Sequence, residues 1–275
     1  MRQVDIVRVD LSLCSVIKKC DLVAEEVPFN IVLNNVYSFV IWCSPSQFRE
    51  LAVGYLFAEE ILYSIDEIEN ISISEKENIC HIQFKASINL VSRMGNRRQN
   101  TRIVPLIKKS TSSYQHDNKI TSINSNVTVK AQTIFDALKQ LNKQAKGFRE
   151  TGGLHNSGIF KADGTMVAFS EDVGRHNTVD KVIGKGMLTQ IDFAQCFILI
   201  TGRIPGDMIY KTAKAGLPIV ASVTAVLNSG ITSAQKANTT LAGFVRNNHL
   251  NIYTHPQRII LQPVVLMENN VKMKN

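Results

Sequence analysis

The alternation of apolar and polar positions separates a strand-rich first part of the chain from a second part in which helices and strands alternate. Residues 30–43 alternate or run apolar with β-branched and aromatic side chains, which predicts two strands joined by a turn at Asn34-Asn35. Apolar residues then recur at helical spacing over 48–62, so we expect a helix there with Pro45 in its first turn. Residues 68–84 return to the alternation of strands.

The second part predicts an amphipathic helix over 129–148 that ends at Gly147, followed by a hairpin of residues 155–160 and 166–170 around Asp163-Gly164. Helices and strands then alternate to the end of the pattern. The expected helices begin at 175 and span 207–215 and 233–245, and the expected strands span 196–200, 218–223 and 250–253. This order is typical of a layered α/β sheet.

Between the two parts, polar and basic residues replace both periodicities. We therefore expect an N-terminal strand-rich α+β domain at 1–92, a basic mobile loop or linker at 93–127, and an α/β cofactor-binding domain at 128–275. Residues 93–119 carry seven Lys or Arg side chains against one acidic side chain. Such a stretch suits phosphates, an acidic protein surface or nucleic acid, or is simply a solvated loop. Because Tyr114 is its one aromatic residue, nucleic acid is the least favoured partner.

The chain has 275 residues, of which 44% are apolar and 20% charged, as in ordinary globular proteins. No apolar run approaches the ~18 residues of a membrane-spanning helix, and Arg2 and Asp5 place charge where a secretory signal would be apolar. We therefore expect a cytoplasmic protein without a membrane partner. The five cysteines form no C-x-x-C pair, which disfavours a disulfide framework and a zinc site. Cys43 and Cys196 lie in apolar runs and are predicted to be buried.

The least generic residues fall where predicted strands end and helices begin. Ligands of open α/β sheets bind at the carboxyl ends of strands, where glycines allow close approach and free N–H groups attract anions. The candidate cofactor-binding residues are Thr151, Gly152, Gly153, His155, Asp172, Gly174, Arg175, His176, Asn177, Gly202 and Arg203.

Several of these residues have two interpretations. Arg175 and Arg203 can each clamp a phosphate with two N–H groups, but Arg175 can also pair with Asp180. Asp172 either accepts hydrogen bonds from a base or caps the following helix.

The histidines near the strand ends do not indicate a metal site. Zinc deaminases place H-x-E at one helix start and P-C-x-x-C at the next. The corresponding segments here, 174–177 and 202–207, contain neither pattern. His176 can equally be a packed histidine or a ligand contact, whereas the glycine turn before His155 gives that residue no packing role.

Taken together, these segments resemble the FdhD family of formate dehydrogenase accessory proteins. The most specific run is Glu171–Gly184. Further matching segments are 26–28, 45–59, 151–155, 202–203, 240–246 and 252–253. The resemblance implies a cytidine-deaminase-like fold for the second half and a homodimer. It also implies a sulfurtransferase that passes sulfur from a cysteine desulfurase to the bis-molybdopterin guanine dinucleotide cofactor of formate dehydrogenase, with GDP as a mimic of that cofactor.

The chain departs from the family at the sulfur-carrying position. The family carries sulfur on a C-G-x-C-G type motif after a Ser-rich stretch, but here residues 112–116 read Ser-Ser-Tyr-Gln-His. No catalytic residue is assigned, because neither Tyr114 nor its neighbours supply the thiolate that sulfur transfer needs. Either Cys14, Cys20 or Cys80 carries the sulfur, or the protein only binds and delivers the cofactor.

Overall fold

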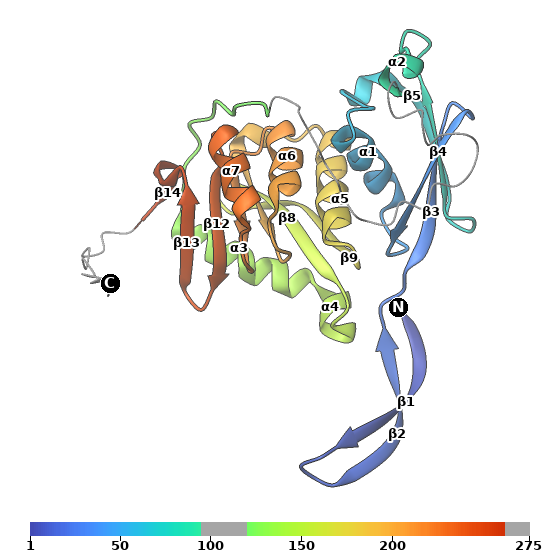
Figure 1. Ribbon diagram of the computed structural model, residues 1–275, viewed down its shortest axis with the longest axis vertical. Coiled ribbons are helices and arrows are strands. Elements are labelled where there is room, and N and C mark those ends of the chain that lie inside the picture. Colours follow the sequence, from blue (N-terminus) through green and yellow to red (C-terminus); the bar gives the residue numbers. More distant parts are fainter. Residues whose placement is uncertain (95–119, 262–275) are drawn as a thin grey trace.

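The computed structural model describes residues 1–94 and 120–261. Two main sheets and a projecting two-stranded ribbon organise these residues (Figure 1). Most of the expected basic loop, residues 95–119 with Tyr114, lies outside the described residues. The elements of the first part are β1 (Arg2–Asp10), β2 (Ser15–Val23), β3 (Val27–Leu33), β4 (Tyr37–Cys43), α1 (Phe48–Ala58), β5 (Ile68–Ser74), β6 (Ile79–Phe84) and α2 (Leu90–Met94).

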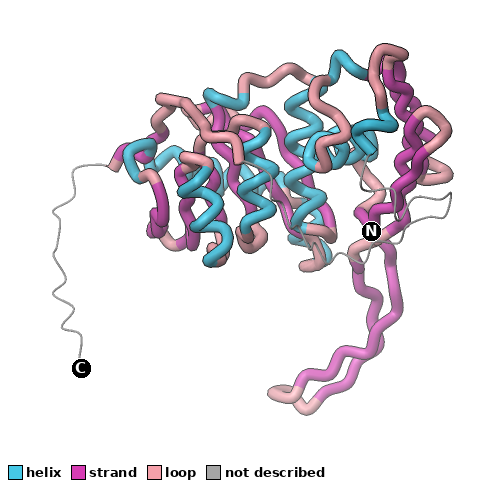
Figure 2. The backbone as a smooth tube through the Cα atoms, turned by 45° about the horizontal axis from the view of Figure 1, so that its top comes forward, coloured by secondary structure: helices cyan, strands magenta, loops and turns pink. Residues whose placement is uncertain are grey.

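Strands β1 and β2 form an antiparallel ribbon that extends away from the rest of the molecule in both overall views (Figures 1 and 2). Its apolar side chains are unusually exposed: Val7 is 58% exposed, Val9 60% and Val16 67%. Leu11 and Leu13 at the tip are still more exposed. A two-stranded ribbon is only marginally stable alone in water, and exposed apolar patches of this kind mark interaction surfaces.

The first main sheet has the strand order β4-β3-β6-β5, with α1 packed on it. Phe29, Ile31 and Leu33 point into this core at the two-residue period of a strand. The predicted strands and their turn at Asn34-Asn35 are confirmed, and both turn residues are left-handed. The predicted helix is also confirmed, but it begins at Phe48, so Pro45 lies in the turn before it.

The second main sheet has the order β13-β12-β11-β10-β8-β9. Its strand β8 is antiparallel to both neighbours, so β9, β10, β11 and β12 run parallel to one another. The elements of this part are β7 (Val129–Lys130), α3 (Ala131–Gln144), α4 (Lys146–Thr151), β8 (His155–Lys161), β9 (Met166–Asp172), α5 (Arg175–Leu188), β10 (Cys196–Ile200), α6 (Gly206–Lys214), β11 (Ile219–Ser222), α7 (Asn228–Lys236), β12 (Thr240–Arg246), β13 (His249–Thr254) and β14 (Ile259–Ile260), which pairs with β7.

Helices cover both faces of this sheet, which makes the second part a three-layer α/β unit (Figure 1). Ile198 and Ile200 of the fully buried β10 face the core shared with α5, α6 and α7. Phe197 and Leu199 face the opposite core, to which α3 contributes Ile134 and its neighbours. The mixed α/β class expected from the sequence is confirmed.

Two predicted helix boundaries are wrong. The helix predicted over 129–148 is divided at Ala145, and α4 continues past Gly147 to Thr151. The helix predicted over 233–245 ends at Lys236, and the rest forms strand β12. The reason is tertiary: β12 pairs with β11 on one side and with β13 on the other, and this buries its apolar and threonine side chains, which outweighs their helical spacing.

The two main parts meet along α1 and α5, which lie side by side (Figure 1). A Cβ atom added to Gly54 would lie 1.8 Å from the carbonyl oxygen of Asp180, and one added to Gly184 would lie 1.9 Å from that of Glu50. Only glycine allows two helix backbones to approach this closely. This contact brings the turn between β4 and α1 next to the beginning of α5.

Candidate functional site at the carboxyl edge of the second sheet

The predicted site residues gather around one edge of the six-stranded sheet. Strands β9, β10 and β11 end at this edge, and α5, α6 and α7 begin there. Because β8 is antiparallel, its first residue His155 lies at the same edge and is paired in register with Asp172 of β9. The sequence-based placement of candidate residues at strand ends is therefore consistent with the structure.

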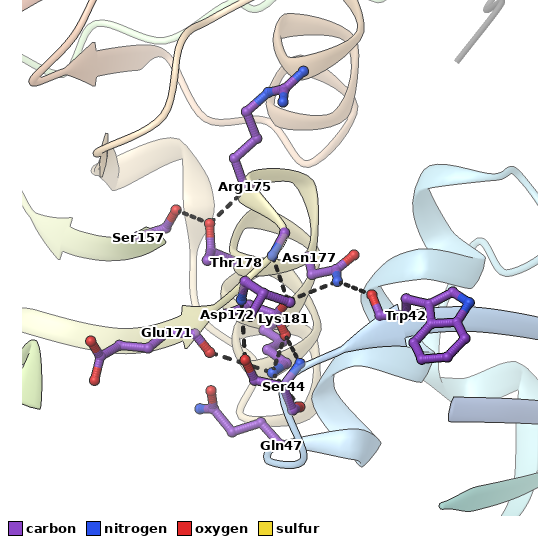
Figure 3. A network of polar contacts seen from close by, with 12 residues as sticks. Trp42, Ser44, Gln47, Ser157, Glu171, Asp172, Arg175, Asn177, Thr178 and Lys181 are labelled. Carbon is purple, nitrogen blue, oxygen red and sulfur yellow. Dashed lines mark hydrogen bonds and ion pairs between the residues drawn. The ribbon is translucent and has the colours of Figure 1, made fainter. Parts of the chain in front are cut away.

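Asp172 lies at the centre of a set of polar residues that we call the interior cluster, namely Ser44, Asp172, Asn177 and Lys181 (Figure 3). Its side chain is fully buried and forms an ion pair with Lys181, with 2.6 Å between Oδ2 and Nζ. Oδ1 accepts hydrogen bonds at 2.8 Å from the Gly174 N–H and from Asn177 Nδ2. Oδ2 accepts a further hydrogen bond from the Ser44 N–H.

These contacts bear on both interpretations of Asp172. Its bond to the Gly174 N–H closes a turn directly before α5, whose N-cap residue is Gly174, and its carboxylate is already occupied by donors of the protein. Asp172 therefore orders the chain just before α5 without being its N-cap, and the structure gives Asp172 no exposed face for a base. The alternative pairing of Arg175 with Asp180 is wrong, because Asp180 binds Lys211, with 2.7 Å between Oδ2 and Nζ.

The interior cluster also fastens the first sheet to the second. Asn177 Nδ2 donates to the backbone oxygen of Trp42, and Ser44 Oγ accepts from the Val173 N–H. Lys181 Nζ lies 3.4 Å from the backbone oxygen of Ser44. The sequence analysis missed Ser44 and Lys181. A signal was available for Lys181, because Asp180 and Lys181 interrupt the apolar residues Val179, Val182 and Ile183 of α5, where a solvated lysine is out of place.

The glycine pair before β8 is the end of helix α4. Thr151 Oγ1 donates to the Gly147 carbonyl and accepts from the Gly153 N–H, and Gly152 adopts a left-handed conformation with φ of 66°. Gly152 and Gly153 are exposed, and Gly153 lies against Ala24 at the base of the ribbon. The turn therefore leads the chain to His155 and leaves the backbone of Gly152 and Gly153, without side chains, exposed at the surface.

Three basic side chains form a second set, which we call the edge cluster: His155, Arg175 and Arg203. Arg175 begins α5 and points away from the interior cluster (Figure 3). Its Nε atom is buried and has no hydrogen-bond partner among the described residues. Its side chain packs over Gly202, where an added Cβ would lie 2.8 Å from the Cβ of Arg175. Gly202 is therefore required for the position of Arg175.

Electrostatics connect the members of the edge cluster. Burial lowers the pKa of His155 from its ordinary 6.5, and the charges of Arg175 and Arg203 lower it further. His155 is therefore mostly neutral at physiological pH, while the exposed Arg203 and the adjacent Arg175 carry full charge. Together with the positive end of the α5 dipole, this arrangement suits an anion such as a phosphate.

His176 belongs to neither cluster. It packs between α5 and α6, with 3.9 Å between its Nε2 and Oδ2 of Asp207. Burial, assisted by the charge of Lys211, lowers the pKa of His176 to about 4, so it is neutral at physiological pH. The structure supports the interpretation of a packed histidine.

The thiols divide into two classes. Burial raises the pKa of Cys43 and Cys80 to about 12 and that of Cys196 to about 11, which leaves these thiols protonated. The predicted burial of Cys43 and Cys196 is confirmed. Cys14 and Cys20 are exposed on the ribbon, and Cys20 Sγ lies 3.1 Å from Oδ1 of Asp5.

Within residues 1–94 and 120–261, no group of three metal-ligating side chains is assembled, and no helix is long and apolar enough to cross a membrane.

Comparison with known proteins identifies the family to which this chain belongs. The family model described as the FdhD/NarQ family matches residues 24–260. The chain belongs to the FdhD/NarQ family. A sulfur carrier protein FdhD of Methanothermobacter thermautotrophicus is 35% identical over 94% of this chain and 98% of its own length. The protein of the same name from Staphylococcus aureus is 30% identical over 87% of this chain and 90% of its own length.

A solved structure has the same fold. The crystal structure of a protein described as a formate dehydrogenase accessory protein, from Desulfotalea psychrophila, matches with a TM-score of 0.75. The match covers 94% of this chain and 99% of that chain at 22% sequence identity. The family expected from the sequence motifs is confirmed.

Proposed function

We propose that this protein binds the bis-molybdopterin guanine dinucleotide cofactor at the edge cluster and delivers it to formate dehydrogenase during maturation of that enzyme. The observation that carries the proposal is the buried Nε of Arg175, which has no hydrogen-bond partner among the described residues and lies beside Gly202. A buried guanidinium donor without a partner is costly, and a phosphate oxygen is its natural acceptor. Relatives that are 30–35% identical are sulfur carrier proteins by name.

The residues at the edge fit the phosphate-bearing part of such a cofactor. Arg175 and Arg203 supply charge-assisted donors, and His155 supplies a third nitrogen group near them. Gly152 and Gly153, with the first N–H groups of α5, offer backbone donors where a Cβ would hinder approach. The cofactor would bring its own metal chemistry, and the protein's part would be to hold and orient it.

Sulfur transfer is the less favoured part of the function, because residues 93–127 contain no cysteine. If transfer occurs, the thiolate of Cys14 attacks the outer sulfur of a cysteine desulfurase persulfide. The S–S bond of the desulfurase breaks, its cysteine leaves as a thiolate, and Cys14 becomes the persulfide. Cys14 is the candidate because it is exposed, whereas Cys20 has its pKa raised by the hydrogen bond to Asp5. We favour the alternative in which the protein is a binding and delivery chaperone.

We extend the proposal to architecture and assembly. Around the antiparallel β8, the order β9-β8-β10-β11-β12, with helices α5, α6 and α7 after successive parallel strands, supports a cytidine-deaminase-like layering. The exposed valines and leucines of the ribbon support a homodimer that covers them. The division into domains at 1–92 and 128–275 and a cytoplasmic location stay predictions, as does the direct partnership with a cysteine desulfurase.

Isothermal titration calorimetry with GDP tests the binding function. We expect the wild-type protein to bind GDP and Arg175→Ala to bind it at least about tenfold more weakly, the effect of losing one charge-assisted hydrogen bond. Lys139→Ala, which removes an exposed cation on the distant helix α3, is the matched control and should bind normally. A wild-type protein with no affinity for GDP would overturn the proposal.

Intact-protein mass spectrometry tests the transfer step. The protein is incubated with a cysteine desulfurase and free cysteine. A mass increase of one sulfur that is lost on reduction, and that Cys14→Ser abolishes, would establish transfer. A protein that binds GDP but gains no sulfur would be a delivery chaperone.

A further inference from the structure

His155 is the one member of the edge cluster whose charge can change near neutral pH. It opens β8 after the glycine turn and is half-buried. The Asn156 N–H donates to Thr201, which holds the loop after β10 beside the start of β8, and Gly202 of that loop packs against Arg175. The groups that act on His155 are therefore cationic, namely Arg175 of the α5 start and Arg203 of the loop after β10. Asp172, its register partner in β9, is occupied by Lys181 and by the Gly174 N–H. The free site therefore holds two full positive charges and a neutral imidazole.

We propose that His155 takes up a proton when a phosphate group binds between it and the two arginines, so that anion binding at this edge is linked to protonation. The inference rests on the proposed phosphate site and goes beyond it by naming the residue that links affinity to pH. It also names the class of ligand, a group with two negative charges such as a pyrophosphate bridge or a terminal phosphate.

The physical reason is a reversal of the local field. In the free protein the two arginines oppose a third positive charge, and burial opposes it as well. A bound group with two negative charges offsets both arginines, so a protonated imidazole then gains an opposite charge and a strong hydrogen bond. A singly charged phosphodiester would leave a net positive field and would not draw the proton.

The sign of the pH dependence follows from linkage. Binding raises the pKa of His155, so the complex holds more protons than the free protein and affinity increases as pH falls. Each unit by which the bound pKa exceeds the free pKa adds about tenfold to affinity at low pH. His176 does not take this part, because its partners are Asp207 and Lys211 on α6 and its pKa is already lowered to about 4.

The experiment is calorimetry of GDP binding at about pH 7 in buffers of different ionisation enthalpy, which counts the protons taken up on binding. The wild-type protein, His155→Gln and the control His81→Gln are compared, since His81 is exposed on β6 of the other sheet. Because the terminal phosphate of GDP itself titrates near neutral pH, the difference between variants is the decisive quantity. Sulfate, a dianion throughout this range, serves as a second probe.

We expect wild type and His81→Gln to take up more protons than His155→Gln. We also expect the affinity lost in His155→Gln to be about tenfold at about pH 6 and small at about pH 8. Equal proton uptake in wild type and His155→Gln would overturn the inference while leaving the GDP site intact. Absence of GDP binding in wild type would overturn the proposed function together with the inference.

A direct measurement covers the case in which His155→Gln fails to fold. The imidazole C–H resonances of the wild-type protein are titrated with and without GDP, and the His155 signal is assigned with His155→Asn. An upward shift of the His155 pKa on binding supports the inference, and an unchanged pKa contradicts it.

Discussion

The interior cluster and the edge cluster share the short stretch 172–181, but their polar groups are satisfied in opposite ways. In the interior cluster every acceptor of Asp172 meets a donor of the protein, and its charge is neutralised by Lys181. In the edge cluster Arg175 keeps a buried Nε without a partner among the described residues, and its neighbours are also basic. The first arrangement stabilises a fold, and the second leaves a donor that an anion from outside would satisfy.

This difference shows why the residues of a family motif cannot all be assigned to ligand binding. Gly174, Arg175, His176 and Asn177 are consecutive, yet the helix turns Asn177 inward and Arg175 outward (Figure 3). Because successive helical residues point about 100° apart, neighbours in a motif contact different surroundings. The interior residues hold the start of α5 in place, and Arg175 faces the proposed ligand position.

The largest expected effect comes from breaking the interior cluster at Lys181. Lys181→Met leaves the carboxylate of Asp172 buried without its counter-charge, which costs about 3–5 kcal/mol of unfolding free energy. Urea unfolding measures this loss. Lys185→Met, the same substitution one turn later on α5 at a partly exposed position, should change stability by less than about 0.5 kcal/mol.

If Lys181→Met does not fold, the double variant Asp172→Asn/Lys181→Met provides the comparison. It removes both charges and retains an oxygen acceptor for the Gly174 N–H, so it should be more stable than the single variant. Near wild-type stability of Lys181→Met would show that the ion pair does not hold the interior cluster together.

A smaller effect is expected at Gly202, where the edge cluster depends on backbone packing. Gly202→Ala places a Cβ 2.8 Å from that of Arg175, so the arginine must move. We expect about tenfold weaker GDP binding and a loss of about 1–3 kcal/mol in stability. The double variant Gly202→Ala/Arg175→Ala should bind GDP no more weakly than Arg175→Ala, because both changes act through one side chain. Additive losses would contradict this coupling.

Arg203 should contribute less than Arg175, because its side chain is exposed and its charge is screened. We expect Arg203→Ala to weaken GDP binding by about threefold to tenfold at low ionic strength, and by less at high salt. Titrations at two salt concentrations measure this. A loss as large and as independent of salt as that of Arg175→Ala would indicate that Arg203 becomes buried on binding.

The sequence predicted the positions of most strands and the edge at which the candidate residues meet, because strand periodicity and the turns at Asn34-Asn35 and Asp163-Gly164 are local signals. It could not predict which candidates face inward. Lys181 and Ser44 complete the interior cluster through contacts between residues 137 apart in the chain. Strand β12 was mistaken for a helix for a similar reason, since only its neighbours β11 and β13 decide its conformation.

The smallest expected effect is a pH-dependent change in stability at His176, which distinguishes this histidine from His155. The pKa of His176 is lowered from 6.5 to about 4 in the folded protein. Below about pH 6.5 the unfolded chain therefore binds a proton at this histidine that the folded protein does not bind. Wild type should therefore lose about 1–2 kcal/mol of stability relative to His176→Gln between pH 6.5 and about pH 5, with no difference above pH 7. Urea unfolding at several pH values measures this, with His81→Gln as control. GDP affinity should be the same in His176→Gln as in wild type across this range, because a histidine that stays neutral between α5 and α6 cannot follow the charge of a ligand at the edge.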